Sequence, residues 1–240
     1  MVDRLFADPG LAALYDEFCA GRRDFSYYLP LVMSARTVLD VGCGTGELLR
    51  TARAAGHTGR LCGLDPAEGM LAQARGRTDV EWVCGDLATA SWHHEFDLVV
   101  MTGHAFQVFV TDDEVRTALR AIRAALTDGG RFAFETRNPA VRAWEQWTPE
   151  RSRDLPAGGR TVRVATEVLD VTGDLVTFVQ RYRAPGWSDE SRSTLRFLDV
   201  DRLDAFLADA GLRVADRRGD WAGGAFTPTS PEVITVAVPG

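Results

Sequence analysis

Short apolar runs and longer stretches with helical spacing alternate along the first half of the chain. The short runs are rich in β-branched residues, as expected of buried strands, and the stretches between them repeat apolar residues every three to four positions, as expected of helices. The expected strands are 37–41, 60–64, 80–83, 96–101 and 131–135, and the expected helices are 47–56, 68–75 and 112–126. Alternation at this spacing gives right-handed crossovers, and therefore a parallel sheet.

The ends of the chain and its second half depart from this alternation. After Asn138-Pro139, a loop rich in Pro, Gly and Arg leads to two alternating runs that predict an antiparallel hairpin, which a third run can join. These runs are 161–169, 175–183 and 193–198. Two short helices, 11–18 and 26–33, are expected to cap the front of the sheet, and a helix over 201–210 with strands over 212–215 and 233–238 is expected to complete it. Asp128-Gly129-Gly130 predicts a turn before strand 131–135.

We therefore predict an α/β fold: a Rossmann-like, seven-stranded, mostly parallel and doubly wound sheet with helices on both faces. An antiparallel β hairpin or sheet is expected as an insertion after the fifth strand. The chain, 1–240, is interpreted as one domain with a helical cap (1–35), a ligand-binding core (36–137), an insertion (138–199) and a closing helix with the last two strands (200–240). In such a sheet the ligand is expected at the carboxyl ends of the strands.

The most informative motif is VLDVGCGTG at residues 38–46, where a strand runs into a glycine turn and then a helix. Glycines at such a turn let a ligand approach the backbone where any Cβ would collide. The G-x-G-x-x-G pattern of dinucleotide enzymes would place its third glycine at position 47, but here it is Gly46, and position 47 is Glu. Asp40 and Glu47 would oppose a pyrophosphate and would instead suit a cation.

Two further acids follow at the ends of the next two strands. Asp65 comes 19 residues after Gly46, where a carboxylate can accept hydrogen bonds from both hydroxyls of a ribose. Asp86 ends the strand after that. An alternative is that Asp65 caps a helix with Pro66 at its first position and that Asp86 is a turn residue. Three acids at three successive strand ends favour a single ligand over this alternative.

The glycine turn and these acids resemble the class I S-adenosylmethionine-dependent methyltransferase family, small-molecule type, over about residues 36–136. The resemblance implies that Gly42, Gly44 and Gly46 surround the methionine moiety, that Asp65 binds the ribose and that Asp86 contacts the adenine amino group. A tyrosine of the front helices is then expected over the methionine part, with Asp24 and Arg22 or Arg23 nearby, although ordinary helix packing explains these tyrosines equally well. The remaining cofactor contacts implied by the resemblance are Asp40, Cys43, Pro66, Met70, Gly85, Leu87, Thr102, Tyr15 and Tyr28.

The loop after strand 96–101 holds His104, which on this fold lies beside the sulfonium. Its unperturbed pKa of about 6.5 suits proton removal at neutral pH, so we expect a general base or substrate orienter. The alternative is a histidine that only shapes the pocket. Phe106, Asn138, Trp144 and Trp147 are expected to line the acceptor site, unless the two tryptophans pack the insertion onto the sheet. His93-His94, at the opposite end of this strand, is expected to face solvent.

Net charge and cysteine content indicate which classes of partner and which compartment to expect. The net charge of −7 gives no overall attraction to nucleic acid or to an anionic membrane, and no run of about 18 apolar residues predicts a membrane span. The Asn/Asp-Pro-Pro-Tyr/Phe pattern typical of enzymes that methylate nucleic-acid bases is absent after strand 96–101. Four cysteines without metal-ligand spacing are interpreted as reduced thiols in a cytoplasmic protein.

We therefore expect a methyltransferase that moves the methyl group of S-adenosylmethionine to an O, N or C atom of a small molecule and releases S-adenosylhomocysteine. The enzyme is expected to be a monomer or homodimer without a metal. Two alternatives stay open at this point: a protein of this fold that binds the cofactor without transferase activity, and an NAD(P)-dependent oxidoreductase. The insertion is where the acceptor is expected to be selected.

Overall fold

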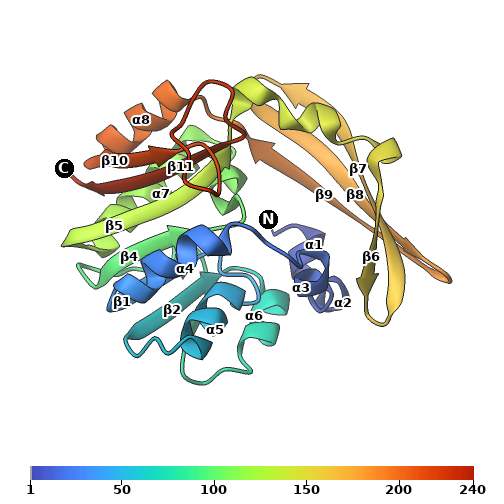
Figure 1. Ribbon diagram of the computed structural model, residues 1–240, viewed down its shortest axis with the longest axis horizontal. Coiled ribbons are helices and arrows are strands. Elements are labelled where there is room, and N and C mark those ends of the chain that lie inside the picture. Colours follow the sequence, from blue (N-terminus) through green and yellow to red (C-terminus); the bar gives the residue numbers. More distant parts are fainter. Residues whose placement is uncertain (1) are drawn as a thin grey trace.

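The computed structural model describes residues 2–240 and contains the predicted seven-stranded sheet (Figure 1). The strand order is β10-β11-β5-β4-β1-β2-β3. Strands β1 to β5 run parallel, and β11 lies antiparallel between β5 and β10. The strands are β1 (Thr37–Val41), β2 (Arg60–Asp65), β3 (Glu81–Cys84), β4 (Phe96–Met101), β5 (Leu126–Arg137), β10 (Leu212–Arg218) and β11 (Glu232–Pro239). The predicted fold class is confirmed.

Helices cover both faces of this sheet because successive residues of its strands point to opposite sides. In β1, Val38 packs with α4 and α5, whereas Leu39 packs with α7 and α8. Helix α7 begins with a capping box between Thr111 and Glu114, as the acid-rich start of this segment favours. The helices are α4 (Phe25–Ser34), α5 (Glu47–Ala54), α6 (Glu68–Ala74), α7 (Asp112–Ala125) and α8 (Val200–Asp209).

Two local predictions were wrong. Asp128-Gly129-Gly130 is part of β5 and not a turn: the register between β4 and β5 shifts there, and a Cβ at Gly130 would lie 2.9 Å from the carbonyl oxygen of Phe96. The glycine therefore serves a close approach of two strands. The single helix expected over 11–18 is two short ones, because Asp8 caps a helix that starts at Pro9. The N-terminal helices are α1 (Arg4–Ala7), α2 (Pro9–Ala12) and α3 (Tyr15–Phe18).

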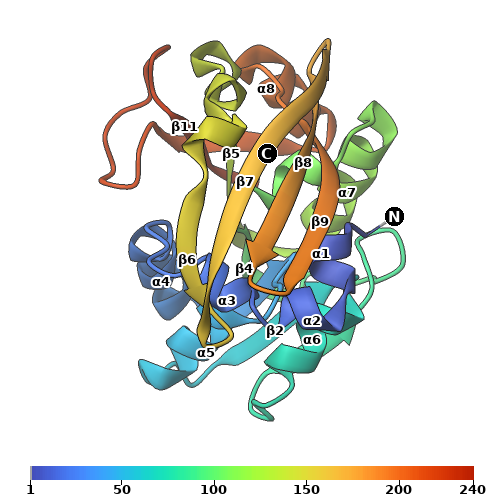
Figure 2. The same ribbon diagram turned by 90° about the vertical axis from the view of Figure 1, so that its right-hand side faces the viewer.

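The insertion is a second, four-stranded antiparallel sheet in the order β6-β7-β8-β9. The predicted hairpin is its β7-β8 pair, and the third run lies in β9, but β6 occupies a stretch expected to be a loop. Figures 1 and 2 show this sheet standing beside the core, with α3 near β6 and α1 near β9. Its strands are β6 (Arg153–Ala157), β7 (Arg160–Thr172), β8 (Leu175–Ala184) and β9 (Trp187–Arg196).

Three 3-10 turns connect the core to this insertion, and a fourth, η1 (Ala105–Val108), follows β4. The connecting turns are η2 (Pro139–Val141), η3 (Ala143–Gln146) and η4 (Pro149–Arg151). Trp144 packs edge-on against Phe197 at 4.5 Å and, with Val176, forms a small apolar cluster. We call this cluster of Trp144, Val176 and Phe197 the insertion seam. No helix within residues 2–240 has the length and apolar content to cross a membrane.

The packing of the insertion seam predicts that Phe197→Ala and Leu169→Ala lower the free energy of unfolding by different amounts. Phe197→Ala is expected to lower the free energy of unfolding by about 3–5 kcal/mol, because Phe197 is 3% exposed and its removal leaves a cavity beside Trp144. Leu169→Ala, on an exposed part of β7, is expected to cost less than about 0.5 kcal/mol. Urea unfolding followed by tryptophan fluorescence measures both. Equal losses would show that the seam does not hold the insertion.

Candidate functional site

The turn between β1 and α5 is built from glycines in a left-handed conformation. Gly42, Gly44 and Gly46 have φ of +72°, +56° and +73°, which residues with a Cβ rarely adopt. The backbone N–H groups of Gly42 and Cys43 both donate to the carbonyl of Leu64, at 2.8 and 3.2 Å, so the turn is tied to the end of β2. The loop therefore exposes backbone at the carboxyl edge of the sheet, where the ligand was expected.

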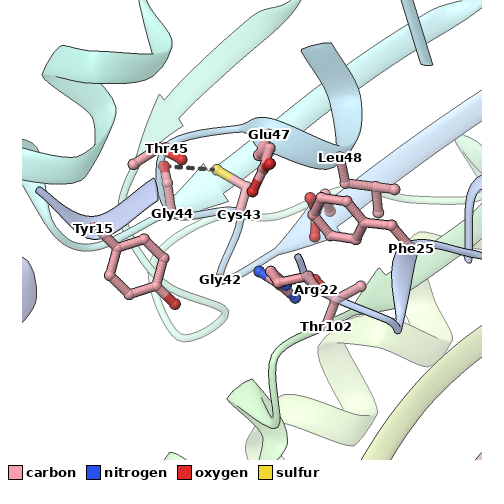
Figure 3. Close-up of a pocket in the computed structure, with 11 residues that line it drawn as sticks. Tyr15, Arg22, Phe25, Gly42, Cys43, Gly44, Thr45, Glu47, Leu48 and Thr102 are labelled. Carbon is pink, nitrogen blue, oxygen red and sulfur yellow. Dashed lines mark hydrogen bonds between the residues drawn. The ribbon is translucent and has the colours of Figure 1, made fainter. Parts of the chain in front are cut away.

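A pocket at this edge is closed by segments far apart in the sequence (Figure 3). The N-terminal helices and the loop between them, the glycine turn with the start of α5, and the end of β4 all contribute side chains. The lining residues are Tyr15, Arg22, Phe25, Asp40, Gly42, Cys43, Gly44, Thr45, Glu47, Leu48 and Thr102. Six of the predicted cofactor residues thus lie together: Tyr15, Asp40, Gly42, Cys43, Gly44 and Thr102.

Asp40 is the most unusual group of the pocket. Its side chain is 1% exposed, and its Oδ1 atom has no hydrogen-bond partner. Burial raises the pKa of Asp40 to about 8, although the nearby Arg22 opposes the shift. A buried carboxyl group that lacks a partner is costly unless a ligand supplies one. Asp40 therefore fits a ligand that brings a positive charge or a hydrogen-bond donor into the pocket.

Arg22 crosses the pocket between the N-terminal helices and β4. Its Nε atom lies 3.1 Å from Asp24, a terminal nitrogen lies 3.2 Å from Thr102 Oγ1, and its guanidinium lies 4.4 Å from the ring centre of Phe25. The neighbouring Arg23 is exposed. The sequence left these two arginines as alternatives, and the structure places Arg22 in the pocket.

Asp65 connects the glycine turn to the loop after β2. Its Oδ2 accepts from the N–H of Gly44 and its Oδ1 from the N–H of Ala67, both at 2.8 Å. Burial raises the pKa of Asp65, and the two backbone bonds oppose that shift. The alternative of a helix with Pro66 at its first position was wrong, because α6 begins at Glu68 and Pro66 is exposed. The ribose contact of Asp65 stays a prediction.

The remaining residues predicted around the adenine lie near the ends of β2 and β3. Asp86 is exposed, and its Oδ1 accepts from the N–H groups of Ala88 and Thr89, so the turn alternative describes its contacts in the structure. Leu87 and Met70 are buried in apolar clusters, and Gly85 precedes the turn with φ of +158°. Their adenine contacts stay predictions.

Tyr28 lies outside the pocket, contrary to the expectation that it contacts the cofactor. It is fully buried, and its hydroxyl donates to Glu135 while its ring packs against Trp221. Phe25, three residues earlier on α4, lines the pocket instead. The two residues are three apart and lie on about the same side of α4, but Phe25 is at its first position, against Arg22, whereas Tyr28 is one turn further along the helix.

His104 follows β4 in a left-handed conformation, with φ of +62°. Its backbone N–H donates to Glu135 Oε1 at 2.7 Å, and its Nε2 lies 2.9 Å from Glu232 Oε2. Burial lowers the pKa of His104 to about 3, and Arg137 acts in the same direction. The pKa of His104 therefore lies below the ordinary value expected from the sequence, and the partly buried ring favours its neutral form.

The other residues predicted to line the acceptor site have structural contacts instead. Phe106 is 1% exposed and packs on Phe134 with ring centres 4.7 Å apart. Asn138 donates to the carbonyls of Pro228 and Ser230, which holds the loop before β11. Trp144 belongs to the insertion seam, and Trp147 packs on Phe178. These contacts agree with the packing alternative. His93 and His94 are exposed, as expected.

Sequence reasoning did not foresee how the charged residues around His104 pair with one another. Glu135 and Arg137 lie at the carboxyl end of β5, and Glu232 begins β11 directly opposite Arg137. Charged residues in otherwise apolar strands are a signal that could have drawn attention to them. Their pairing depends on a register between segments about 95 residues apart, which no local pattern specifies.

Comparison with known proteins agrees with this site. The methyltransferase domain family matches residues 38–130. The chain is 30% identical over 209 residues to the cypemycin N-terminal methyltransferase of a Streptomyces species, which covers 85% of this chain and 83% of that protein. Its structure is similar to the S-adenosylmethionine-bound amino pentose methyltransferase CalS10 of Micromonospora echinaspora, with a TM-score of 0.68, 27% identity and coverage of 90% and 89%. An S-adenosylmethionine-dependent methyltransferase of Clostridium acetobutylicum shares the fold, with a TM-score of 0.75, 15% identity and coverage of 94% and 96%.

The fold is that of S-adenosylmethionine-dependent methyltransferases, and the glycine turn and the pocket lie at the carboxyl edge of its sheet. The chain belongs to the class I S-adenosylmethionine-dependent methyltransferases. It is accordingly an enzyme with S-adenosylmethionine as methyl donor. The oxidoreductase and the binding protein without transferase activity, both open from the sequence, are set aside.

Gly46 and Gly186 have the same φ of +73°. Their alanine variants therefore separate the cost of the left-handed backbone conformation from the cost of a steric contact. Gly186→Ala, in an open turn between β8 and β9, is expected to cost about 1–2 kcal/mol of unfolding free energy, the penalty of the left-handed conformation. Gly46→Ala is expected to cost about 1–3 kcal/mol more, because its Cβ would lie 2.2 Å from the Trp82 ring. Urea unfolding of both variants measures the difference, and equal costs would contradict the close packing of Trp82 on the turn.

Proposed function

We propose that the acceptor is a small-molecule amine and that the atom methylated is its nitrogen. The cypemycin enzyme is named for an N-terminal position, and the enzyme CalS10 for an amino pentose, so both named acceptors carry an amino group. The charge around His104 is consistent with an amine, because three acids, Glu135, Glu232 and Asp24, lie near it with two arginines, Arg137 and Arg22. A hydroxyl acceptor would gain less from this surplus of carboxyl groups.

The observation that carries the cofactor site is the unpartnered Oδ1 of Asp40 beside left-handed glycines. S-adenosylmethionine, when bound, supplies a methyl group that the sulfonium charge has already activated. Asp40 would face the positive charge of the methionine moiety, Arg22 would face its carboxylate, and Asp65 would accept from the ribose hydroxyls. The glycine turn lets these groups approach the backbone.

The chain's main contribution to rate is then orientation. Holding two reactants in line is worth up to about 7–11 kcal/mol in well-oriented systems. Arg22, Phe25 and Thr102 lie on one side of the pocket and Tyr15 on the other (Figure 3), and together they would keep water from the transfer. The neutral His104 accepts the proton that an amine must lose. Acceptor choice is assigned to the insertion, whose sheet stands beside this edge of the core (Figure 2).

The proposal is tested in two stages. Calorimetric titration with S-adenosylmethionine, S-adenosylhomocysteine and NADH should show binding of the two sulfur nucleosides and none of NADH. A panel of small primary amines, each paired with the alcohol of the same skeleton, is then incubated with S-adenosylmethionine and analysed by mass spectrometry. Methylation of amines alone supports a nitrogen acceptor, whereas methylation of the alcohols would overturn it.

Asp65→Ala is expected to weaken S-adenosylmethionine binding about tenfold to a hundredfold, or about 1.5–3 kcal/mol, the usual value of hydrogen bonds to a charged group. The variant also frees the N–H groups of Gly44 and Ala67, which acts in the same direction. Asp79→Ala, at an exposed acid paired with Arg77, is the matched control and should bind normally. Unchanged affinity in Asp65→Ala would refute the assignment.

Asp40 predicts that cofactor binding releases a proton. In the free protein its pKa of about 8 keeps the carboxyl protonated at pH 7, whereas the carboxylate form is the one that pairs with a cation. Affinity for S-adenosylmethionine should therefore rise about fivefold from pH 7 to pH 8, and about twofold more above pH 8 before it levels off. Calorimetry in buffers of different ionisation enthalpy measures the released proton. Asp40→Asn should lose this component, and a wild type without it would contradict the role of Asp40.

A further inference from the structure

Glu232 contacts His104 although it is 128 residues away in sequence. It is the first residue of β11, and its register partner on β5 is Arg137. The Glu232 side chain is 14% exposed and that of His104 17%, so solvent screens their contact only weakly. The 2.9 Å separation of Nε2 and Oε2 is a hydrogen bond of normal length.

The other side of His104 is also fixed. Its backbone N–H donates to Glu135 Oε1, while Glu135 Oε2 accepts from the Tyr28 hydroxyl. A left-handed conformation in a residue other than glycine is costly and persists where the surroundings enforce it. Glu135 thus holds the backbone of His104, and Glu232 holds its ring. Such double fixation is what a proton acceptor needs to stay in one geometry.

The groups facing this pair favour sharing of a single proton. Arg137 of β5, Glu135 of β5, and Asp24 and Arg22 of the N-terminal segment all act on His104 or Glu232. Burial lowers the pKa of His104 to about 3 and raises the pKa of Glu232 to about 7, so both groups resist carrying a charge alone. Groups in such contact titrate as a unit and not singly.

We propose that Glu232 is a positioning residue that holds His104 with the proton on Nε2, so that Nδ1 is the proton acceptor of the methylation reaction. This inference rests on the proposed amine acceptor. As the new N–C bond formed, the S–CH3 bond of the donor would break and its electron pair would stay on sulfur. The surplus proton on the nitrogen would pass to the lone pair of Nδ1 while Glu232 is ionised, because the carboxylate offsets the cost that burial places on a charged ring. The resulting imidazolium is stabilised by its Nε2–H bond to the Glu232 carboxylate.

The test reads the ring of His104 directly and needs no acceptor. Nitrogen-15 NMR of the histidine rings distinguishes the two tautomers and follows protonation with pH, and His104→Gln identifies the His104 signals among the four histidines. In the wild type above pH 8, where Glu232 is ionised, we expect one tautomer with the proton on Nε2. Glu232→Gln should populate both tautomers and lower the pH at which the ring takes up a proton by at least one unit.

Two controls keep the outcome interpretable. Glu150→Gln changes an exposed glutamate in η4 and should leave the His104 signals unchanged. If Glu232→Gln does not fold, Glu232→Asp keeps the charge but shortens the side chain, and it should shift the same signals in the same direction. Unchanged His104 tautomer and titration in a folded Glu232 variant would overturn the proposal.

Measuring cofactor affinity distinguishes a failure of this inference from a failure of the proposed function. Glu232 does not line the pocket around the glycine turn, so Glu232→Gln should bind S-adenosylmethionine within about twofold of the wild type. A wild type that fails to methylate any amine would contradict the acceptor, whereas the NMR result stands on its own. A Glu232→Gln variant that loses cofactor affinity would show a structural role and count against positioning of His104 alone.

Discussion

Buried carboxyl groups at one edge of a parallel sheet are the constraint around which this enzyme is arranged. Because β1, β2, β4 and β5 all end at that edge, the side chains that follow them converge there. Each buried acid must find a donor or remain uncharged. Asp65 takes two backbone N–H groups, Glu135 takes Tyr28 and the N–H of His104, and Asp24 takes Arg22. Only Asp40 Oδ1 is unpartnered among the carboxylate oxygens buried in residues 2–240.

The N-terminal helices make the site depend on both sheets. Asp16 of α3 accepts from Arg50 of α5 at 2.7 Å and from the hydroxyl of Thr45 in the glycine turn. The next residue, Glu17, accepts from the N–H of Gly158 in the turn between β6 and β7, at 2.6 Å. One short helix thus contacts the cofactor side of the core and the insertion at once. A substitution that moves the insertion would therefore also displace α3, and through it the glycine turn.

Features of the site that depend on local sequence could be predicted, and those that depend on distant pairing could not. The glycine turn and Asp40 follow from a strand, a turn and a helix that are contiguous. Tyr28 was placed wrongly because its burial depends on Glu135 and Trp221, which are more than 100 residues away in the sequence. β6 was missed because Pro156 and the glycines after it are typical of a loop, whereas the strand lies at the edge of its sheet, where proline is tolerated.

In His104, some properties depend on local sequence and others depend on contacts with distant segments. Its position after β4 was predictable, because this strand is a contiguous apolar run, and its role as a base stays a prediction. Its pKa was not predictable, since burial, Arg137 and the contact with Glu232 come from β5 and β11. Arg22, Asp24 and Glu135 act electrostatically on both Asp40 and His104, so the proposed cofactor contact and the proposed base are coupled. A substitution that changes the charge at one of the two therefore also acts on the other.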